Sequence, residues 1–213
     1  MFTGIIEATG TISSIQRKGG DYQIAVNSGD LDLSDVALGD SIATNGVCLT
    51  VVSLNSNGYV ADVSNETIKN TGFAKYQVGQ KVNLEKAMLP TTRFGGHMVS
   101  GHVDCVTEVA SIIDNGRAKD IWLYLPKDHA KYLVKKGSVT IDGISLTVND
   151  VNETQFKLTI VPHTSSNTTL DYLYVGSSVN LEVDLVARYV ERLIMNKEQG
   201  VTMELLSRTG YLK

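Results

Sequence analysis

Two histidines among glycines are the first residues of this sequence that could do chemistry. His97 and His102 lie five residues apart in the segment GGHMVSGHVD, which begins at Gly95. Histidine is the side chain that can move protons near neutral pH without a special environment. The flanking glycines would let a ligand approach the backbone closely. The segment therefore indicates a proton-transfer site, and two exposed loop histidines are the alternative interpretation.

Polar side chains also recur at matching points of two apolar segments, GVCLTV and GISLTV. Thr50 and Thr147 are the same in both segments, whereas Cys48 in the first corresponds to Ser145 in the second. Two interpretations are open. The segments are strands that turn a polar face to solvent, or they line a barrel mouth with hydroxyl donors.

Other kinds of site find little support in the sequence. Two cysteines and four histidines lack the paired short spacings of a zinc site, so we expect no metal. The glycine pairs form neither a GxGxxG motif nor a Walker A loop, which argues against nucleotide phosphate binding. Ser100 and Ser145 lack the nucleophile-elbow context of a hydrolase.

The composition excludes further classes of protein. The 213 residues predict one large domain or two small ones, and 42% apolar residues suffice for a core. Nineteen basic and 23 acidic residues give a net charge of −4, which argues against a nucleic-acid partner. The apolar runs are too short for a membrane helix, and the first residues do not form a secretory signal. Two cysteines fit a reducing compartment, so we expect a cytoplasmic protein.

The chain is a tandem repeat. When the sequence is slid by 97 residues, Gly4 aligns with Gly101, and the motif VNLE at Val82 aligns with VNLE at Val179. The same offset holds from the start of each half to its end. One offset sustained in this way indicates a duplicated structural unit.

Each half consists of short apolar stretches broken by turn residues, a pattern typical of strands. The predicted strands are Tyr22–Val26, Gly46–Leu54, Tyr59–Val63 and Lys81–Glu85, then Ile121–Leu125, Ile144–Val148, Gln155–Val161 and Ser178–Asp184. Short helical turns are expected near Asn65–Thr71 and Pro126–Val134. Many short strands favour a small closed barrel, which leaves no sheet edge exposed. The junction Ala87–Gly96 ends in two glycines, which predicts a flexible connection between the halves.

The end of the chain breaks the repeat. Apolar residues at helical spacing predict a helix over Leu185–Glu198, with Asp184 as its N-cap. A second helical piece is expected at Met203–Ser207, capped by Thr202. The first helix must bury its apolar stripe, either on its own chain or on other subunits. This stripe consists of Val186, Tyr189, Val190, Leu193 and Ile194.

Several segments together resemble riboflavin synthase of the trimeric alpha-chain type. They are MFTGIIE at the start, NGVCLTV, GGHMVSGHVD, IDGISLTV, and NLEVD before the tail helix. The resemblance covers the whole chain in order. It implies a mainly β fold of two duplicated six-stranded Greek-key closed β-barrels plus a C-terminal α-helix. Lumazine-binding barrels are then expected at residues 1–94 and 95–184, and a helical tail for oligomerisation at 185–213.

The resemblance also implies a reaction. Two molecules of 6,7-dimethyl-8-ribityllumazine exchange a four-carbon unit and give riboflavin and 5-amino-6-(D-ribitylamino)uracil, with no cofactor. The implied assembly is a homotrimer whose active site lies between neighbouring subunits. Lumazine synthase is a further partner that the resemblance suggests.

The family's pocket carries over residue by residue. In the first barrel the implied substrate-binding residues are Gly4, Ile5, Ile6, Cys48, Leu49, Thr50, Asp62, Val63, Ser64, Asn65, Glu66 and Thr67. In the second barrel they are Gly101, His102, Val103, Lys136, Ser145, Leu146, Thr147, Thr159, Ile160, Val161, Pro162, His163 and Thr164. The resemblance makes His102 the proton-transfer residue, and Ser145, Thr147 and Cys48 the groups that polarise the ring or deliver a nucleophile to its C7. His97 belongs to the same catalytic set, with Phe2, Ser41 and Asp184 in support.

Two alternatives to an enzyme are open. The first is a non-catalytic lumazine- or flavin-binding optical protein with the same duplicated fold. Such proteins tend to lose the catalytic motifs in one half, whereas this chain keeps the histidine segment together with Cys48, Ser145 and Thr147. The second is an unrelated binding module of two barrels, which would ignore ribityllumazine.

Overall fold

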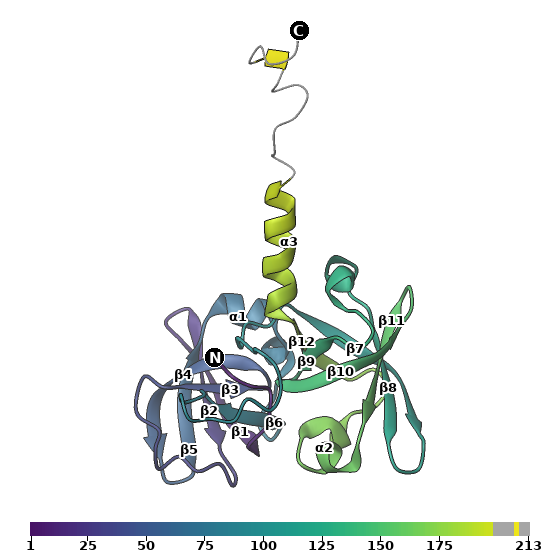
Figure 1. Ribbon diagram of the computed structural model, residues 1–213. Helices are drawn as coiled ribbons and strands as arrows, with labels where there is room; N and C mark the ends of the chain where they lie inside the picture. The colour runs from purple at the N-terminus through teal and green to yellow at the C-terminus, as the bar shows by residue number, and fades with distance from the viewer. Residues whose placement is uncertain (198–206, 209–213) are drawn as a thin grey trace.

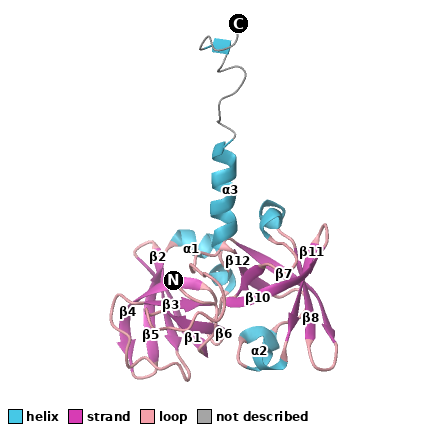
Figure 2. Ribbon diagram, in the orientation of Figure 1, coloured by secondary structure: helices cyan, strands magenta, loops and turns pink. Residues whose placement is uncertain are grey.

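The computed structural model describes residues 1–197 and 207–208, and it contains two closed six-stranded barrels beside each other (Figure 1). Strands make up most of both barrels, and the helices are short except for the one that projects from between them (Figure 2). The prediction of a mainly β fold with two duplicated barrels is confirmed.

The first barrel has the circular strand order β1-β2-β5-β4-β3-β6, and all its pairs are antiparallel. Because β3, β4 and β5 follow one another and β6 returns to lie beside β3, the connection is a Greek key. A short helix and a 3-10 turn link β5 to β6. The elements are β1 (Ala8–Lys18), β2 (Asp21–Asn27), β3 (Ser41–Thr44), β4 (Val47–Asn55), β5 (Gly58–Val63), α1 (Asn65–Asn70), η1 (Gly72–Lys75) and β6 (Lys81–Lys86).

The second barrel repeats this topology. Its bulges also fall at the same places, since the register shifts at Val51/Ser53 and again at Val148/Asp150, 97 residues later. The elements are β7 (Cys105–Asp114), β8 (Lys119–Tyr124), η2 (Lys127–Tyr132), β9 (Ser138–Ile141), β10 (Ile144–Val151), β11 (Gln155–Ile160), α2 (Pro162–Ser166), η3 (Thr169–Tyr172) and β12 (Ser178–Val183). All eight strands predicted from the sequence are confirmed within a few residues, and β1, β3, β7 and β9 complete the barrels.

Each barrel encloses its own apolar core. Ile24, Tyr59 and Leu84 lie in the first core, and Leu158 and Leu181 are buried in the second. Burying one large apolar side chain contributes roughly 1.5–3 kcal/mol, so each core can stabilise its barrel separately.

A buried polar seam joins the two barrels. The Asn83 side-chain amide donates to the backbone oxygen of Asp142 at 2.9 Å, and the Asn180 amide donates to the backbone oxygen of Asn45 at 2.8 Å. Asn45 and Asp142 both have positive φ, 46° and 45°. These bonds come from equivalent positions in the two halves, so the barrels are related by a pseudo-twofold axis at the seam.

The junction between the halves is packed tightly at its end. A Cβ on Gly96 would lie 2.1 Å from the backbone oxygen of Thr3 and 2.8 Å from the Cβ of Ser145. The prediction of a flexible connection is therefore wrong at this position, where glycine allows a close approach instead.

The tail helix α3 spans Leu185–Lys197, and the Asp184 carboxylate accepts from the Val186 amide at 2.9 Å, as expected for an N-cap. The polar side of α3 is tied to the second barrel, where Arg188 pairs with Asp104 and Glu191 pairs with Lys131. The predicted stripe is 47–65% exposed, so it does not fold back on its own chain. The piece predicted at Met203–Ser207, with its cap, lies outside the described residues except for Ser207.

Among the described helices, none has the length and the apolar composition that crossing a membrane would require.

Candidate functional site

The segments that precede the two barrels, residues 2–6 and 99–103, are exchanged between them. The Ser145 amide of β10 donates to the backbone oxygen of Gly4 at 2.8 Å, and the Cys48 amide of β4 donates to the backbone oxygen of Gly101 at 2.9 Å. We call these segments the first and second arm. Each arm therefore lies against the barrel of the other repeat.

Packing of the arm side chains agrees with this exchange. Ile6 packs against the core of the second barrel, and Val103 packs against the core of the first. Phe2 and Val99 form a two-way backbone bridge where the arms meet, with N···O distances of 2.8 and 3.1 Å. The grouping expected from the sequence is corrected accordingly. Gly4–Ile6 belong with Ser145, and Gly101–Val103 belong with Cys48.

A buried carboxylate holds each arm. Glu85 on β6 accepts from the Thr3 amide and hydroxyl, both at 2.7 Å, and Glu182 on β12 accepts from the Ser100 amide and hydroxyl at the same distance. Burial raises the pKa of both glutamates, against the opposing effect of these hydrogen bonds. Sequence reasoning assigned neither glutamate to the site, although the repeated VNLE motif marks both.

The second-barrel site contains a chain of polar side chains. His97 Nδ1 lies 2.7 Å from Ser145 Oγ, and its Nε2 lies 3.1 Å from Thr140 Oγ1. His97 is only 8% exposed, so the alternative of an exposed loop histidine is wrong for this residue. Burial lowers the pKa of His97, and the nearby Asp184 carboxylate opposes that shift only in part. His97 is therefore a neutral imidazole near pH 7.

The first-barrel site is apolar where the second is polar. Cys48 packs with Phe2 and Ala43, and both of these side chains are buried. Ala43 faces Cys48 across the β3–β4 ladder, at the position that Thr140 has opposite Ser145. His102 follows Gly101 and is exposed beside this site. The structure thus separates the two histidines, with His97 at Ser145 and His102 next to the arm residue that binds Cys48.

The remaining predicted segments are strand-to-helix corners. Asp62–Thr67 runs from β5 into α1, where the Ser64 hydroxyl caps the Thr67 amide at 3.1 Å. Thr159–Thr164 runs from β11 into α2, whose first residue is Pro162. Thr50 and Thr147 are exposed on β4 and β10, which favours the interpretation of polar outer faces over a barrel mouth.

At each corner a carboxylate is hydrogen-bonded to a side chain on the neighbouring strand. Asp62 accepts from Gln23 Nε2 at 2.8 Å, and Asp120 accepts from Thr159 Oγ1 at 2.6 Å. Gln23 and Asp120 were not expected at the site. The 97-residue alignment does contain a signal for them, because it pairs Gln23 with Asp120 and Asp62 with Thr159. The carboxylate of the pair therefore lies on β5 in the first half and on β8 in the second.

Lys136 has an unusual backbone conformation. Its φ is 68°, and it replaces Gly39 of the first half, whose φ is 95°. Both amides make the same contact, donating to Val148 O at 2.7 Å and to Val51 O at 2.9 Å. A lysine held where glycine is favoured indicates a side chain required by its site.

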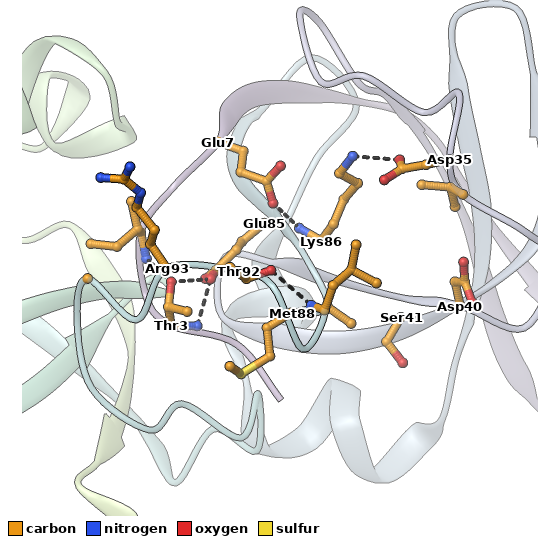
Figure 3. A pocket seen from close by; sticks show the side chains of 15 residues that line it. Thr3, Glu7, Asp35, Asp40, Ser41, Glu85, Lys86, Met88, Thr92 and Arg93 are labelled. Carbon is orange, nitrogen blue, oxygen red and sulfur yellow. Dashed lines mark hydrogen bonds and ion pairs between the residues drawn. The ribbon is translucent and has the colours of Figure 1, made fainter.

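A cavity of about 590 Å³ lies beside the first barrel and the junction (Figure 3). Of the predicted residues, its lining includes Ile5 and Ser41. Two of its charged groups pair with each other, since Lys86 binds Asp35 at 2.6 Å, and Glu7 accepts from the Lys86 backbone amide at 2.7 Å. Neither Cys48 nor Ser145 lines this cavity. Within the described part of the chain, no three histidine, cysteine or acidic side chains gather as metal ligands.

Comparison with known proteins agrees with the duplicated architecture. The family model described as "Lumazine binding domain" matches twice, at residues 3–87 and 100–184. The structure is similar to that of LumP in complex with riboflavin, with a TM-score of 0.79 and 26% identity, covering 86% of this chain and 99% of that one.

Curated relatives are more similar in sequence. Riboflavin synthase of Photobacterium phosphoreum is 59% identical, and that of Photobacterium leiognathi is 56% identical, with both chains of each pair fully covered. Riboflavin synthase of Bacillus subtilis is 42% identical over 99% of this chain and 100% of its own length. Full-length similarity at this level and two matches to the domain model show that this chain belongs to the riboflavin synthase family.

Proposed function

We propose that this chain catalyses the dismutation of two molecules of 6,7-dimethyl-8-ribityllumazine, giving riboflavin and 5-amino-6-(D-ribitylamino)uracil. The observation that carries the proposal is the pair of equivalent sites with different chemistry. One site has Cys48 among apolar side chains, and the other has Ser145 bound to a buried histidine. Two related sites suit a reaction in which the same molecule serves as donor and as acceptor of the four-carbon unit.

The reaction demands positioning and proton transfer. The C7 methyl group of lumazine is acidic because its carbanion delocalises into the ring, and that carbanion attacks the partner ring. Holding the two rings in the correct orientation lowers the activation barrier by up to ~7–11 kcal/mol in well-oriented systems. A placed acid or base adds about 10²–10⁴-fold, the role we assign to His102. The groups that polarise the ring or deliver the nucleophile to C7 are Ser145, Thr147 and Cys48. The two products together contain all the atoms of the two substrates. The transfer then needs no cofactor.

We further propose that the active unit is a homotrimer. Tyr189, Leu193 and Ile194 on α3 are each at least 60% exposed, while Arg188 and Glu191 anchor the opposite side of the helix to the second barrel. An exposed apolar stripe of this size is typical of an interface. Three such helices would cover one another and bring the first-barrel site of one chain to the second-barrel site of its neighbour. A cytoplasmic location and an association with lumazine synthase belong to the same proposal.

The second candidate is an optical protein that binds lumazine or flavin without turnover. The similarity to LumP, solved in complex with 6,7-dimethyl-8-ribityllumazine and with riboflavin, favours it. The 59% identity to a riboflavin synthase, against 26% to LumP, favours the enzyme.

One incubation separates the two candidates. The purified protein is mixed with a large excess of 6,7-dimethyl-8-ribityllumazine alone, and riboflavin fluorescence is followed. Continuous production over many turnovers is expected. A protein that purifies coloured, holds the lumazine and leaves the excess unchanged would be the optical protein.

A further inference from the structure

Thr140 is a buried residue that contacts His97. The family resemblance gave it no role in the site. It lies on β9 directly opposite Ser145 on β10, and the His97 ring bridges the two hydroxyl groups. Thr140 is 1% exposed. Its equivalent in the first barrel is Ala43, which has no hydroxyl, so the arrangement exists in one half only.

The protons in the hydrogen bonds that link Thr140, His97 and Ser145 can be placed by elimination. A neutral imidazole carries one N–H, and here each ring nitrogen faces a hydroxyl that can donate or accept. Among the described residues, the one hydrogen-bond partner of Thr140 Oγ1 is His97 Nε2. If Nε2 carried the proton, the Thr140 hydroxyl proton would be left buried without an acceptor, which is costly. Thr140 therefore donates to Nε2, and the imidazole proton resides on Nδ1.

This tautomer decides what Ser145 can do. His97 Nδ1–H donates to Ser145 Oγ at 2.7 Å, so the serine oxygen is an acceptor in this bond. The Ser145 hydroxyl proton is then free to point away from the ring, and the side chain is only partly buried. A serine in this state donates to a ligand. It is not the nucleophile of a Ser–His pair, in which the histidine would accept the serine proton.

We propose that Thr140 is a positioning residue that holds His97 as the Nδ1–H tautomer and thereby makes Ser145 a hydrogen-bond donor to the bound lumazine. The last step rests on the proposed function, because it takes the ligand of this site to be a lumazine. The tautomer itself is a property of the free protein.

The test is a long-range ¹H–¹⁵N spectrum of the histidine rings in the full-length protein, with the His97 signals identified by their loss in His97→Asn. The wild-type protein is expected to show a protonated Nδ1 and an unprotonated Nε2. Thr140→Val removes the hydroxyl with little change of shape, and a shift toward the Nε2–H tautomer is expected. Thr140→Ser restores a hydroxyl and should restore the wild-type pattern.

Turnover gives a second readout. Thr140→Val is expected to lower kcat by ~10-fold while KM changes little, because Ser145 loses its donor role more in the transition state than in binding. A wild-type His97 protonated on Nε2, or an unchanged tautomer in Thr140→Val, would overturn the inference. If no variant or wild-type protein makes riboflavin, the proposed function fails, yet the spectra still decide the role of Thr140.

Discussion

The backbone oxygen of Gly4 accepts its hydrogen bond from the amide of Ser145, a residue of the opposite repeat. The equivalent bond joins Gly101 to Cys48. Each candidate site is therefore built from one barrel and from the arm that leads into the other. This arrangement ties two sites of different chemistry to the same seam.

The arms require glycine, and this can be measured. A Cβ on Gly101, at a φ of 80°, would lie 2.6 Å from the Cβ of Cys48 and 3.0 Å from its amide nitrogen. Gly101→Ala should lower the free energy of unfolding by more than ~2 kcal/mol and weaken ligand binding. Gly79→Ala is the matched control, because Gly79 has a φ of 93° with nothing near its Cβ position. It should cost about 1 kcal/mol and leave binding intact. Equal losses in urea unfolding would contradict the close approach.

Asp142 at the seam predicts a pH dependence of stability. Burial raises its pKa to about 7. A carboxyl with a raised pKa stabilises the fold below its unfolded pKa of about 4, and that contribution is lost as pH rises toward 7. Asp142→Asn should therefore gain stability relative to wild type at pH 8 and little at pH 4. The gain in stability is expected to be smaller than the ~4 kcal/mol that three pKa units allow, because the new amide group would lack a partner. In the first half the equivalent residue, Asn45, donates to the Tyr76 hydroxyl, whereas the equivalent of Tyr76 in the second half is Leu173, which lines the cleft beside Asp142.

Urea unfolding of both proteins at several pH values checks this prediction. The buried Glu85 and Glu182 are the same in wild type and variant, so the difference between the two curves isolates Asp142. A difference that does not change with pH would show that Asp142 is already ionised in the fold.

The two sites should respond differently to the loss of their reactive side chains. Ser145→Ala leaves His97 Nδ1 without its partner, and we expect kcat to fall ~100-fold. Cys48→Ala removes a thiol from apolar surroundings and should cost less than ~10-fold. His102→Gln should lower turnover ~10-fold or more while the lumazine still binds. Steady-state kinetics with fluorescence titration of the ligand measures all three. Identical losses in Ser145→Ala and Cys48→Ala would contradict the assignment of separate roles.

The tail predicts assembly. Truncation after Asp184 removes the exposed stripe of α3, and sedimentation should show smaller particles that no longer form riboflavin. The first barrel should still bind ribityllumazine or riboflavin. Leu193→Glu on the full chain tests the stripe alone, with Arg192→Glu as a control on another face. A truncated protein that remains trimeric would place the interface on the barrels.

Much of the fold could be predicted because the duplication is visible in the sequence. An offset of 97 residues and eight apolar stretches define two similar barrels, and the spacing of Tyr189 and Leu193 defines the tail helix. The strands β3 and β9 have only four residues each, too few for alternation to be recognised. They became evident only as the partners that close each barrel.

The exchange of the arms could not be predicted. A repeat pairs Gly4 with Gly101 but does not say which barrel each arm contacts, because that depends on how the barrels are oriented about the seam. The same holds for Thr140, since its role appears only when β9, β10 and the segment of His97, just before the second arm, meet. His97 and His102 are five residues apart in sequence, yet His97 binds Ser145 and His102 follows the glycine that binds Cys48.

The central claim is that a first-barrel site of one chain and a second-barrel site of another form riboflavin together. Thr50→Arg and Thr147→Arg are matched variants at equivalent exposed positions, each expected to block one site and abolish turnover. The two inactive proteins are unfolded together, refolded as a mixture and assayed with lumazine. Random assembly gives about a quarter of the junctions two unblocked sites, so roughly a quarter of the wild-type activity is expected. A mixture as inactive as its components, although it forms mixed trimers, would show that the active site lies within one chain.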